Sequence, residues 1–171
     1  MYRIGDVVSY GTVGICTVDD IRMESSGRGS TKKQEYYVLK PSATPTCMIY
    51  VPRTNESLTQ KMRPILTKVQ IDEMISSARG KKVPWIEDTR QRTDAYQQIV
   101  LKGISEELLL LIACLYEEKR AREEEKRKFC ATDEKLLASA ERLVSEEFSY
   151  SLQISREQVS AYIAQKIKTA I

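Results

Sequence analysis

The residue pattern of the chain changes near residue 66, and this change limits the folds open to it. Up to Leu66, short runs of apolar, β-branched and aromatic residues alternate with glycine and proline. Beyond that point, apolar residues recur at helical spacing between polar helix-start signals. Strand runs and helix runs that are segregated along a chain indicate an α+β protein. We therefore expect a β domain over residues 1–66 and an all-α domain over residues 67–171.

The first domain is expected to be a small β-barrel of the SH3 or Tudor kind. Short strands at close spacing with turn residues between them are typical of such folds. The expected strands cover residues 6–10, 15–18, 35–39 and 47–51. Gly11 and Gly14 indicate a turn after the first strand, and the polar residues 25–31 indicate a hairpin tip.

The second domain is expected to consist of five helices. They cover residues 67–80, 88–102, 105 onward, 132–148 and 155 to the end of the chain. The segments 67–70 and 155–158 have the Ser/Thr-x-x-Gln pattern of a capping box, and Gly80 and Gly103 favour helix ends. The charge-dense stretch 117–128 is predicted to be a solvated helix end with ion pairs four residues apart, rather than a nucleic-acid patch.

The residue inventory argues against an enzyme and against a metal or cofactor site. The chain has no histidine, which is the commonest general base and metal ligand. Its four cysteines include no C-x-x-C pair, so we expect them as small apolar residues. The longest apolar run, residues 108–115, is too short for a membrane span, and the N-terminus lacks the plan of a signal peptide. These features favour a cytoplasmic protein with no small-molecule ligand.

The most unusual local segment is residues 79–85, which contains the only tryptophan, Trp85. Pro84 keeps the segment extended before the next helix. Basic residues flank the indole on both sides: Lys81, Lys82, Arg90 and Arg92. Cations that hold phosphates around a flat ring are what a wedge into the DNA minor groove requires. The alternative is that Trp85 packs against its own domain and that the cations are ordinary surface residues.

Two further features have a functional and an ordinary interpretation. Lys135 lies in the first turn of an expected helix, where the helix dipole disfavours a cation unless a phosphate is bound there; simple solvent exposure explains it as well. The run Met48-Ile49-Tyr50-Val51 before a proline could be an exposed edge strand that accepts a partner strand. It could equally be an internal barrel strand.

The order of these landmarks resembles the CarD family of bacterial transcription regulators. Residues 2–8 resemble the aromatic-x-x-Gly-Asp-x-Val start of the family, and residues 35–40 followed by 51–52 resemble its E-Y-x-V-L-K and V-P landmarks. Trp85 resembles the tryptophan that precedes a basic helix in the family, and residues 132–140 resemble its S-x-x-E-K-x-x-L-x-x-A helix. The first domain is also similar to the polymerase-interacting domain of transcription-repair coupling factors.

The resemblance implies a regulator that joins RNA polymerase to promoter DNA. The β domain would bind the polymerase β subunit, partly by sheet extension, through Met48, Ile49, Tyr50, Val51, Arg53 and Arg22. The helical domain would contact promoter DNA near the −10 element without sequence specificity, Trp85 entering the minor groove to stabilise the open complex. The phosphates would be met by Arg90 or Arg92, Lys135, Lys81 and Lys82.

The chain also departs from the family pattern. Tyr50 stands where the family has a polymerase-contacting arginine, and Glu87 and Asp88 follow closely after the tryptophan, where the family often has basic residues. The helical part is balanced in charge, with 17 basic and 18 acidic residues over 71–171. The acidic pair Glu87-Asp88 and this charge balance support an alternative, a protein-interaction adaptor that binds polymerase or another protein without touching DNA.

Overall fold

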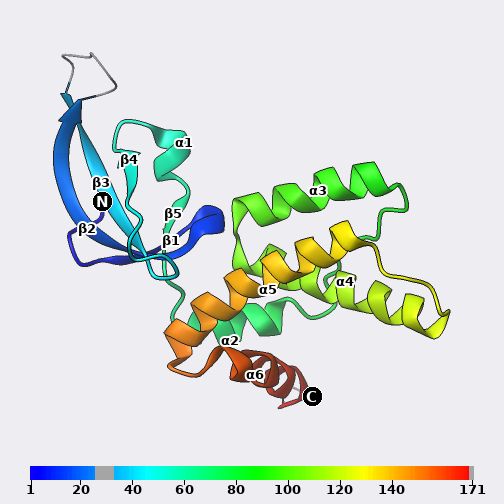
Figure 1. The fold of residues 1–171 in the computed structure, drawn as a ribbon. Coiled ribbons are helices and arrows are strands. Elements are labelled where there is room, and N and C mark those ends of the chain that lie inside the picture. Colours follow the sequence, from blue (N-terminus) through cyan, green and yellow to red (C-terminus); the bar gives the residue numbers. More distant parts are fainter. Residues whose placement is uncertain (26–32, 170–171) are drawn as a thin grey trace. The chain divides into compact units, whose positions relative to one another are not determined.

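A computed structural model describes residues 1–25 and 33–169 of the chain (Figure 1). The expected hairpin tip lies largely at residues 26–32, outside the described residues. The chain forms two compact units, Met1–Ile65 and Leu66–Ile171. The first unit contains an antiparallel sheet and the second consists of helices, so the α+β class is confirmed.

The described residues of the first unit form five antiparallel strands in the order β4-β3-β2-β1-β5. They are β1 (Val7–Tyr10), β2 (Gly14–Ser25), β3 (Lys33–Pro41), β4 (Ile49–Pro52) and β5 (Met62–Pro64). A 3₁₀ turn, Gly11–Val13, joins β1 to β2, and the positive φ of 47° at Gly11 and 93° at Gly14 explains the two glycines of the predicted turn. The helix α1 (Glu56–Thr59), capped by Asn55, precedes β5.

The core of the first unit comes from alternate positions of the long β2–β3 pair and its neighbours. Its buried residues are Val8, Tyr10, Cys16, Val18, Tyr37, Leu39, Val51 and Met62. A register shift between Val18 and Asp20 marks a bulge in β2, and bulges locally increase strand twist. Among the described residues no ladder joins β4 to β5, so the sheet is open and the expected closed barrel is not confirmed.

The second unit contains five helices around one apolar core. They are α2 (Lys68–Ser77), α3 (Thr89–Lys102), α4 (Ser105–Glu124), α5 (Ala131–Leu152) and α6 (Arg156–Thr169). The capping box of Thr67 and Gln70 is confirmed, and Gly103 ends α3 with a positive φ of 66°. The α5 helix begins at Ala131 with Cys130 as its N-cap residue, so the predicted start at Thr132 was wrong by one residue. None of the described helices is both long and apolar enough to span a membrane.

Buried carboxylates connect the helices of the second unit. Glu147 of α5 accepts hydrogen bonds from the Leu66 amide at 3.2 Å and the Ser105 hydroxyl at 2.6 Å. Ser105 therefore begins α4 without capping it by its side chain, because its hydroxyl is bound to α5. The bond to Leu66 connects this first residue of the helical unit to α5.

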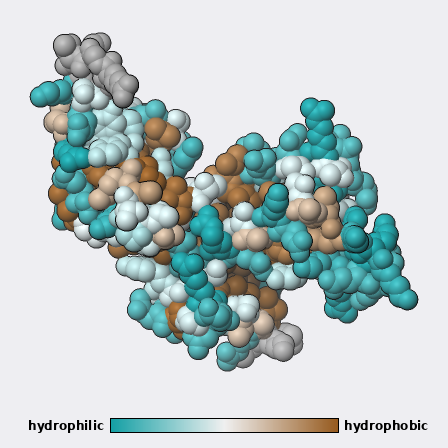
Figure 2. Space-filling model, viewed as in Figure 1, coloured by the Kyte–Doolittle hydropathy of each residue, from teal (hydrophilic) through white to brown (hydrophobic). Residues whose placement is uncertain are grey.

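The charged end of α4 is hydrophilic, as Figure 2 shows for the face in view. Arg120 pairs with Glu124 at 3.1 Å and Arg122 with Glu118 at 2.6 Å, each four residues apart. These contacts confirm the predicted ion pairs of this helix end.

Candidate functional site

The first candidate site is the exposed edge of the sheet at β4. Among the described strands β4 pairs with β3 alone, so the structure favours the edge strand over the internal one. Tyr50 and the preceding Met48 are exposed, Ile49 is half-buried, and Val51 belongs to the core. Val51 therefore offers no side chain to a partner, because its side chain is inside the unit. We call Met48 to Val51, with Arg22 and Arg53, the β4 edge.

Tyr50 is surrounded by polar and aromatic neighbours from the adjacent strands. The Arg22 guanidinium donates to the Tyr50 hydroxyl at 2.5 Å and lies 5.3 Å from the ring centroid. Tyr36 meets the Tyr50 ring edge-on at 6.4 Å. Tyr36 and Tyr50, with Glu24 and Ser25, border a hollow of about 310 Å³. The sequence prediction missed Tyr36, although its position next to the buried Tyr37 in an alternating strand marks it as facing the other side of the sheet.

Arg53 is less available than the prediction assumed. Its guanidinium forms an ion pair with Glu35 and lies 5.1 Å from the centre of the Tyr37 ring. Its backbone amide also donates to the Glu35 carbonyl at 2.9 Å. Arg53 therefore fixes the end of β4 against β3, whereas Tyr50 and Met48 are the side chains that the edge presents.

The second candidate site is built around Trp85, which lies in the connector between α2 and α3. The connector is held on both sides of the indole. Before it, the Pro84 carbonyl accepts a hydrogen bond from the Tyr96 hydroxyl at 2.9 Å. After it, the Ile86 and Glu87 carbonyls accept from Arg92 at 2.8 and 3.0 Å. Burial raises the pKa of Tyr96, so this phenol stays protonated as a donor.

The indole itself is half-buried between cations. The Arg92 guanidinium lies 4.3 Å and that of Arg122 5.6 Å from the indole ring centroid, and Tyr96 packs at 6.3 Å. The indole Nε1 is buried and has no hydrogen-bond partner among the described residues. Trp85 thus packs against its own unit while part of its surface stays accessible. The packing agrees with the interpretation that Trp85 belongs to its own domain, and the accessible part of the ring is what the minor-groove interpretation requires. We call Trp85, Tyr96, Arg92, Arg122 and Asp133 the tryptophan cluster.

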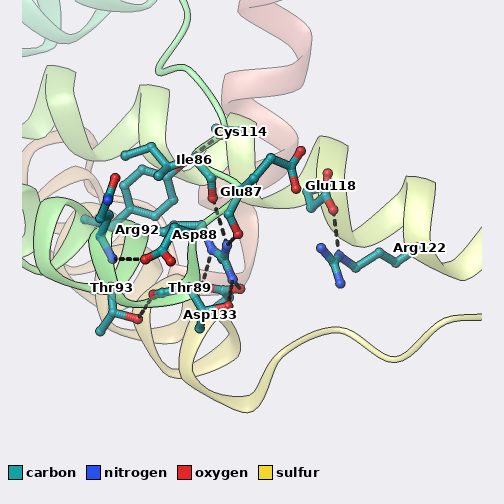
Figure 3. A network of polar contacts seen from close by, with 12 residues as sticks. Ile86, Glu87, Asp88, Thr89, Arg92, Thr93, Cys114, Glu118, Arg122 and Asp133 are labelled. Atoms are coloured by element: carbon teal, nitrogen blue, oxygen red, sulfur yellow. Dashed lines mark hydrogen bonds and ion pairs between the residues drawn. The ribbon is translucent and has the colours of Figure 1, made fainter.

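Arg92 is buried, which corrects its expected place among the surface cations. It is 2% exposed and binds Asp133, which is 0% exposed, through Nε at 3.1 and 3.2 Å and Nη2 at 2.9 Å (Figure 3). Burial alone would lower the pKa of Arg92, but the hydrogen bonds and charge of Asp133 raise it above its usual value. The guanidinium is therefore a charged internal group that is not presented to a phosphate.

The other predicted cations remain on the surface. Arg90 is exposed in the first turn of α3. Lys135 is exposed one residue beyond the first turn of α5, because α5 begins at Ala131, so its expected first-turn position was wrong. The Arg92–Asp133 pair joins these same two turns, so both cations lie on the same end of the unit as the tryptophan cluster. Lys81 and Lys82 are exposed and pair with Glu106 at 2.6 Å and Glu117 at 3.3 Å, respectively; these last two lie on α4.

Arg122 was missed because its stretch was expected to be fully solvated. It is 21% exposed on its side chain, and it reaches the indole while bound to Glu118. A signal was present in the sequence: the apolar stripe of α4 at Leu111 and Leu115 continues at helical spacing to positions 118 and 122. Among the described residues no group of three or more possible metal ligands is present.

Comparison with protein families identifies the first unit. The sheet with an exposed edge has the character of an interaction module, and residues 2–66 match the family model described as the CarD-like/TRCF RID domain. The first unit therefore matches the CarD-like/TRCF RID domain family, as the resemblance implied. The match does not extend to the helical unit. None of the curated proteins compared with the chain matches it.

Proposed function

We propose that this protein regulates transcription initiation in the bacterial cytoplasm by joining RNA polymerase to promoter DNA, and that it is not an enzyme. The family of the first unit supports an interaction with polymerase. We assign this contact to the β4 edge and to the polymerase β subunit. An edge strand offers unpaired backbone groups to a partner strand, and the exposed Tyr50 and Met48 supply apolar contacts beside it.

We assign the DNA contact to the tryptophan cluster and the exposed cations around it. The observation that carries this assignment is the half-buried indole, whose connector is anchored before and after the ring. A planar side chain with a fixed orientation can enter an opened base step at a smaller entropic cost than a free one. Arg90 and Lys135 are suited to the phosphates on either side. In this proposal the indole hinders closure of the melted promoter and so stabilises the open complex.

The DNA contact is expected to be weak by itself. Three or four phosphate contacts give a modest affinity that falls with salt. Binding to polymerase raises the local concentration of the helical unit at the promoter and compensates for this weakness.

The test is the lifetime of the open complex in the presence of the full-length protein. Trp85→Ala should shorten this lifetime while polymerase binding is retained. Tyr150→Ala, which removes an exposed aromatic ring from α5, is the control and should leave the lifetime unchanged. A second variant, Trp85→Phe, keeps part of the packing of the ring and is used if Trp85→Ala does not fold.

A second candidate function is an adaptor that binds polymerase without touching DNA. The pairing of Lys81 and Lys82 with acidic residues of α4 and the burial of Arg92 favour it, because fewer cations are left for phosphates. An unchanged open-complex lifetime for a folded Trp85→Ala variant that still binds polymerase would support the adaptor.

A further inference from the structure

The tryptophan cluster contains an internal ion pair, and Arg92 of this pair also binds the segment that carries the indole. Arg92 donates to Asp133 with Nε and Nη2, and to the carbonyls of Ile86 and Glu87 with Nη1. Its Nη2 is also 3.4 Å from the Thr89 hydroxyl. Figure 3 shows the guanidinium between Asp133 and the start of α3. One side chain thus joins the first turn of α5 to the two residues that follow Trp85.

The same guanidinium lies over the indole ring, 4.3 Å from its centroid. Arg92 therefore fixes both the backbone that follows Trp85 and the position of the ring. The planar fork of arginine suits this double contact, since it stacks on an aromatic face while its edge donates several hydrogen bonds. A lysine ammonium at the same place has three donors and no planar face, so it cannot reproduce the arrangement.

Stability alone does not explain why a charged pair occupies this interior position. Taking two charges out of water is costly, and well-packed apolar residues of similar volume often replace a buried ion pair without loss of stability. Apart from the 3.4 Å contact to the Thr89 hydroxyl at the start of α3, the hydrogen bonds that accompany the pair end on the connector. The contacts of the pair therefore bear on the orientation of the connector.

We infer that Arg92 and Asp133 form a lock that positions Trp85, Arg92 acting through the indole and its backbone and not by contact with a partner. Asp133 orients Arg92 from the first turn of α5, and Arg92 holds the ring and the connector. Arg122, which is tied to Glu118, lies over the same ring as a second cation. The expected change in open-complex lifetime rests on the proposed function, whereas the expected change in the position of the Trp85 ring does not.

The single tryptophan makes this inference directly measurable. Emission and acrylamide quenching of the full-length protein report on Trp85 alone, because the chain has no other tryptophan. Arg92→Lys keeps the positive charge and removes the fork. We expect a red shift of the emission, stronger quenching, and an open-complex lifetime that falls toward that of Trp85→Ala. Arg120→Lys, at a largely exposed position of α4 that has no assigned role in DNA binding, is the control and should change neither the indole signals nor the lifetime.

Asp133→Asn provides a second variant in case Arg92→Lys does not fold, since it removes the charge with almost no change of size. Unchanged emission and quenching in a folded Arg92→Lys protein would overturn the inference. Loss of the fold in both variants would also overturn it, because the pair would then hold the whole unit rather than the indole. A changed indole signal with an unchanged open-complex lifetime would support the lock and refute the DNA contact of the proposed function.

Discussion

The two candidate sites present their contact groups in opposite ways. At the β4 edge, Tyr50 and Met48 are exposed side chains beside a strand that has one free side among the described strands. At the tryptophan cluster, one half-buried ring is held by contacts from α3, α4 and α5. The edge depends on the order of the strands, whereas the cluster depends on the orientation of a single side chain.

This difference suggests that the two sites contribute differently to binding and to the effect on the promoter. A strand edge gains affinity from repeated backbone hydrogen bonds and tolerates changes in individual side chains. A single wedge has no such repetition, so its effect depends on how little freedom the ring loses on binding. We therefore expect the β4 edge to supply most of the attachment and the tryptophan cluster to supply the effect on the promoter.

The strongest test of the comparison removes one partner of the buried pair. Asp133→Ala leaves Arg92 charged and unpaired in the interior, which should destabilise the helical unit by about 3–5 kcal/mol. Denaturant unfolding followed by circular dichroism measures the loss. Glu134→Ala, the next residue on α5, removes an exposed pair with Lys119 at 3.5 Å and should cost about 1 kcal/mol or less. Equal losses of unfolding free energy in the two variants would mean that Asp133→Ala leaves no unpaired charge in the interior. That result would contradict the buried pairing of Arg92 with Asp133.

At the β4 edge the expected effect is smaller and falls on affinity rather than on stability. Tyr50→Ala should weaken binding to polymerase by about tenfold, near 1.4 kcal/mol, because an exposed aromatic ring at an interface is a common energetic anchor. The control is Tyr150→Ala in the helical unit, since Tyr150 is 45% exposed against 44% for Tyr50. Surface-binding measurements with purified polymerase give both affinities. Similar values for the two variants would place the polymerase contact elsewhere.

Features set by neighbouring residues could be predicted from the sequence. The capping box at Thr67 lies within one helical turn, and the glycine turn between β1 and β2 depends on φ angles that glycine tolerates. The edge position of β4 remained open, because it depends on which strands pair. The short strand β5 was not predicted, since three residues that end in Pro64 carry too little pattern.

The environment of Arg92 could not be predicted, because its partner lies far away in the sequence. Asp133 is 41 residues further along the chain, and both residues occur in stretches that look like ordinary helix starts. The sequence shows a cation near a tryptophan but not whether it faces water or a carboxylate. Trp85 itself was identified as unusual, and its half-buried state follows from contacts with helices that local pattern does not place.

The exposed cation Lys135 gives a prediction about the salt dependence of DNA binding. Lys135→Ala should weaken DNA binding and reduce the slope of log affinity against log salt by about one, as expected for one lost phosphate contact. Lys68→Ala, at the exposed first position of α2, is the control. Fluorescence anisotropy of a labelled promoter fragment at several salt concentrations gives the slopes. The DNA assignment of Lys135 fails if its slope equals that of the wild type.

The smallest expected effect concerns Cys130, the N-cap residue of α5, which adjoins the lock. The nearby Thr132 and Asp133 amides lower the pKa of its thiol, whereas burial raises the pKa of Cys114. Since the thiolate is the nucleophile, alkylation of Cys130 by iodoacetamide should reach half of its maximal rate at a pH below that of an ordinary thiol. Mass spectrometry of the modified peptides across pH measures this, with Cys114 reacting only at higher pH. A Cys130 midpoint at or above the ordinary thiol value would mean that these amides do not stabilise the thiolate. Asp133 lies at the start of α5 close to Cys130, and it also binds Arg92, which lies over the indole. Modification of Cys130 should therefore alter the Trp85 emission and leave polymerase binding at the β4 edge unchanged.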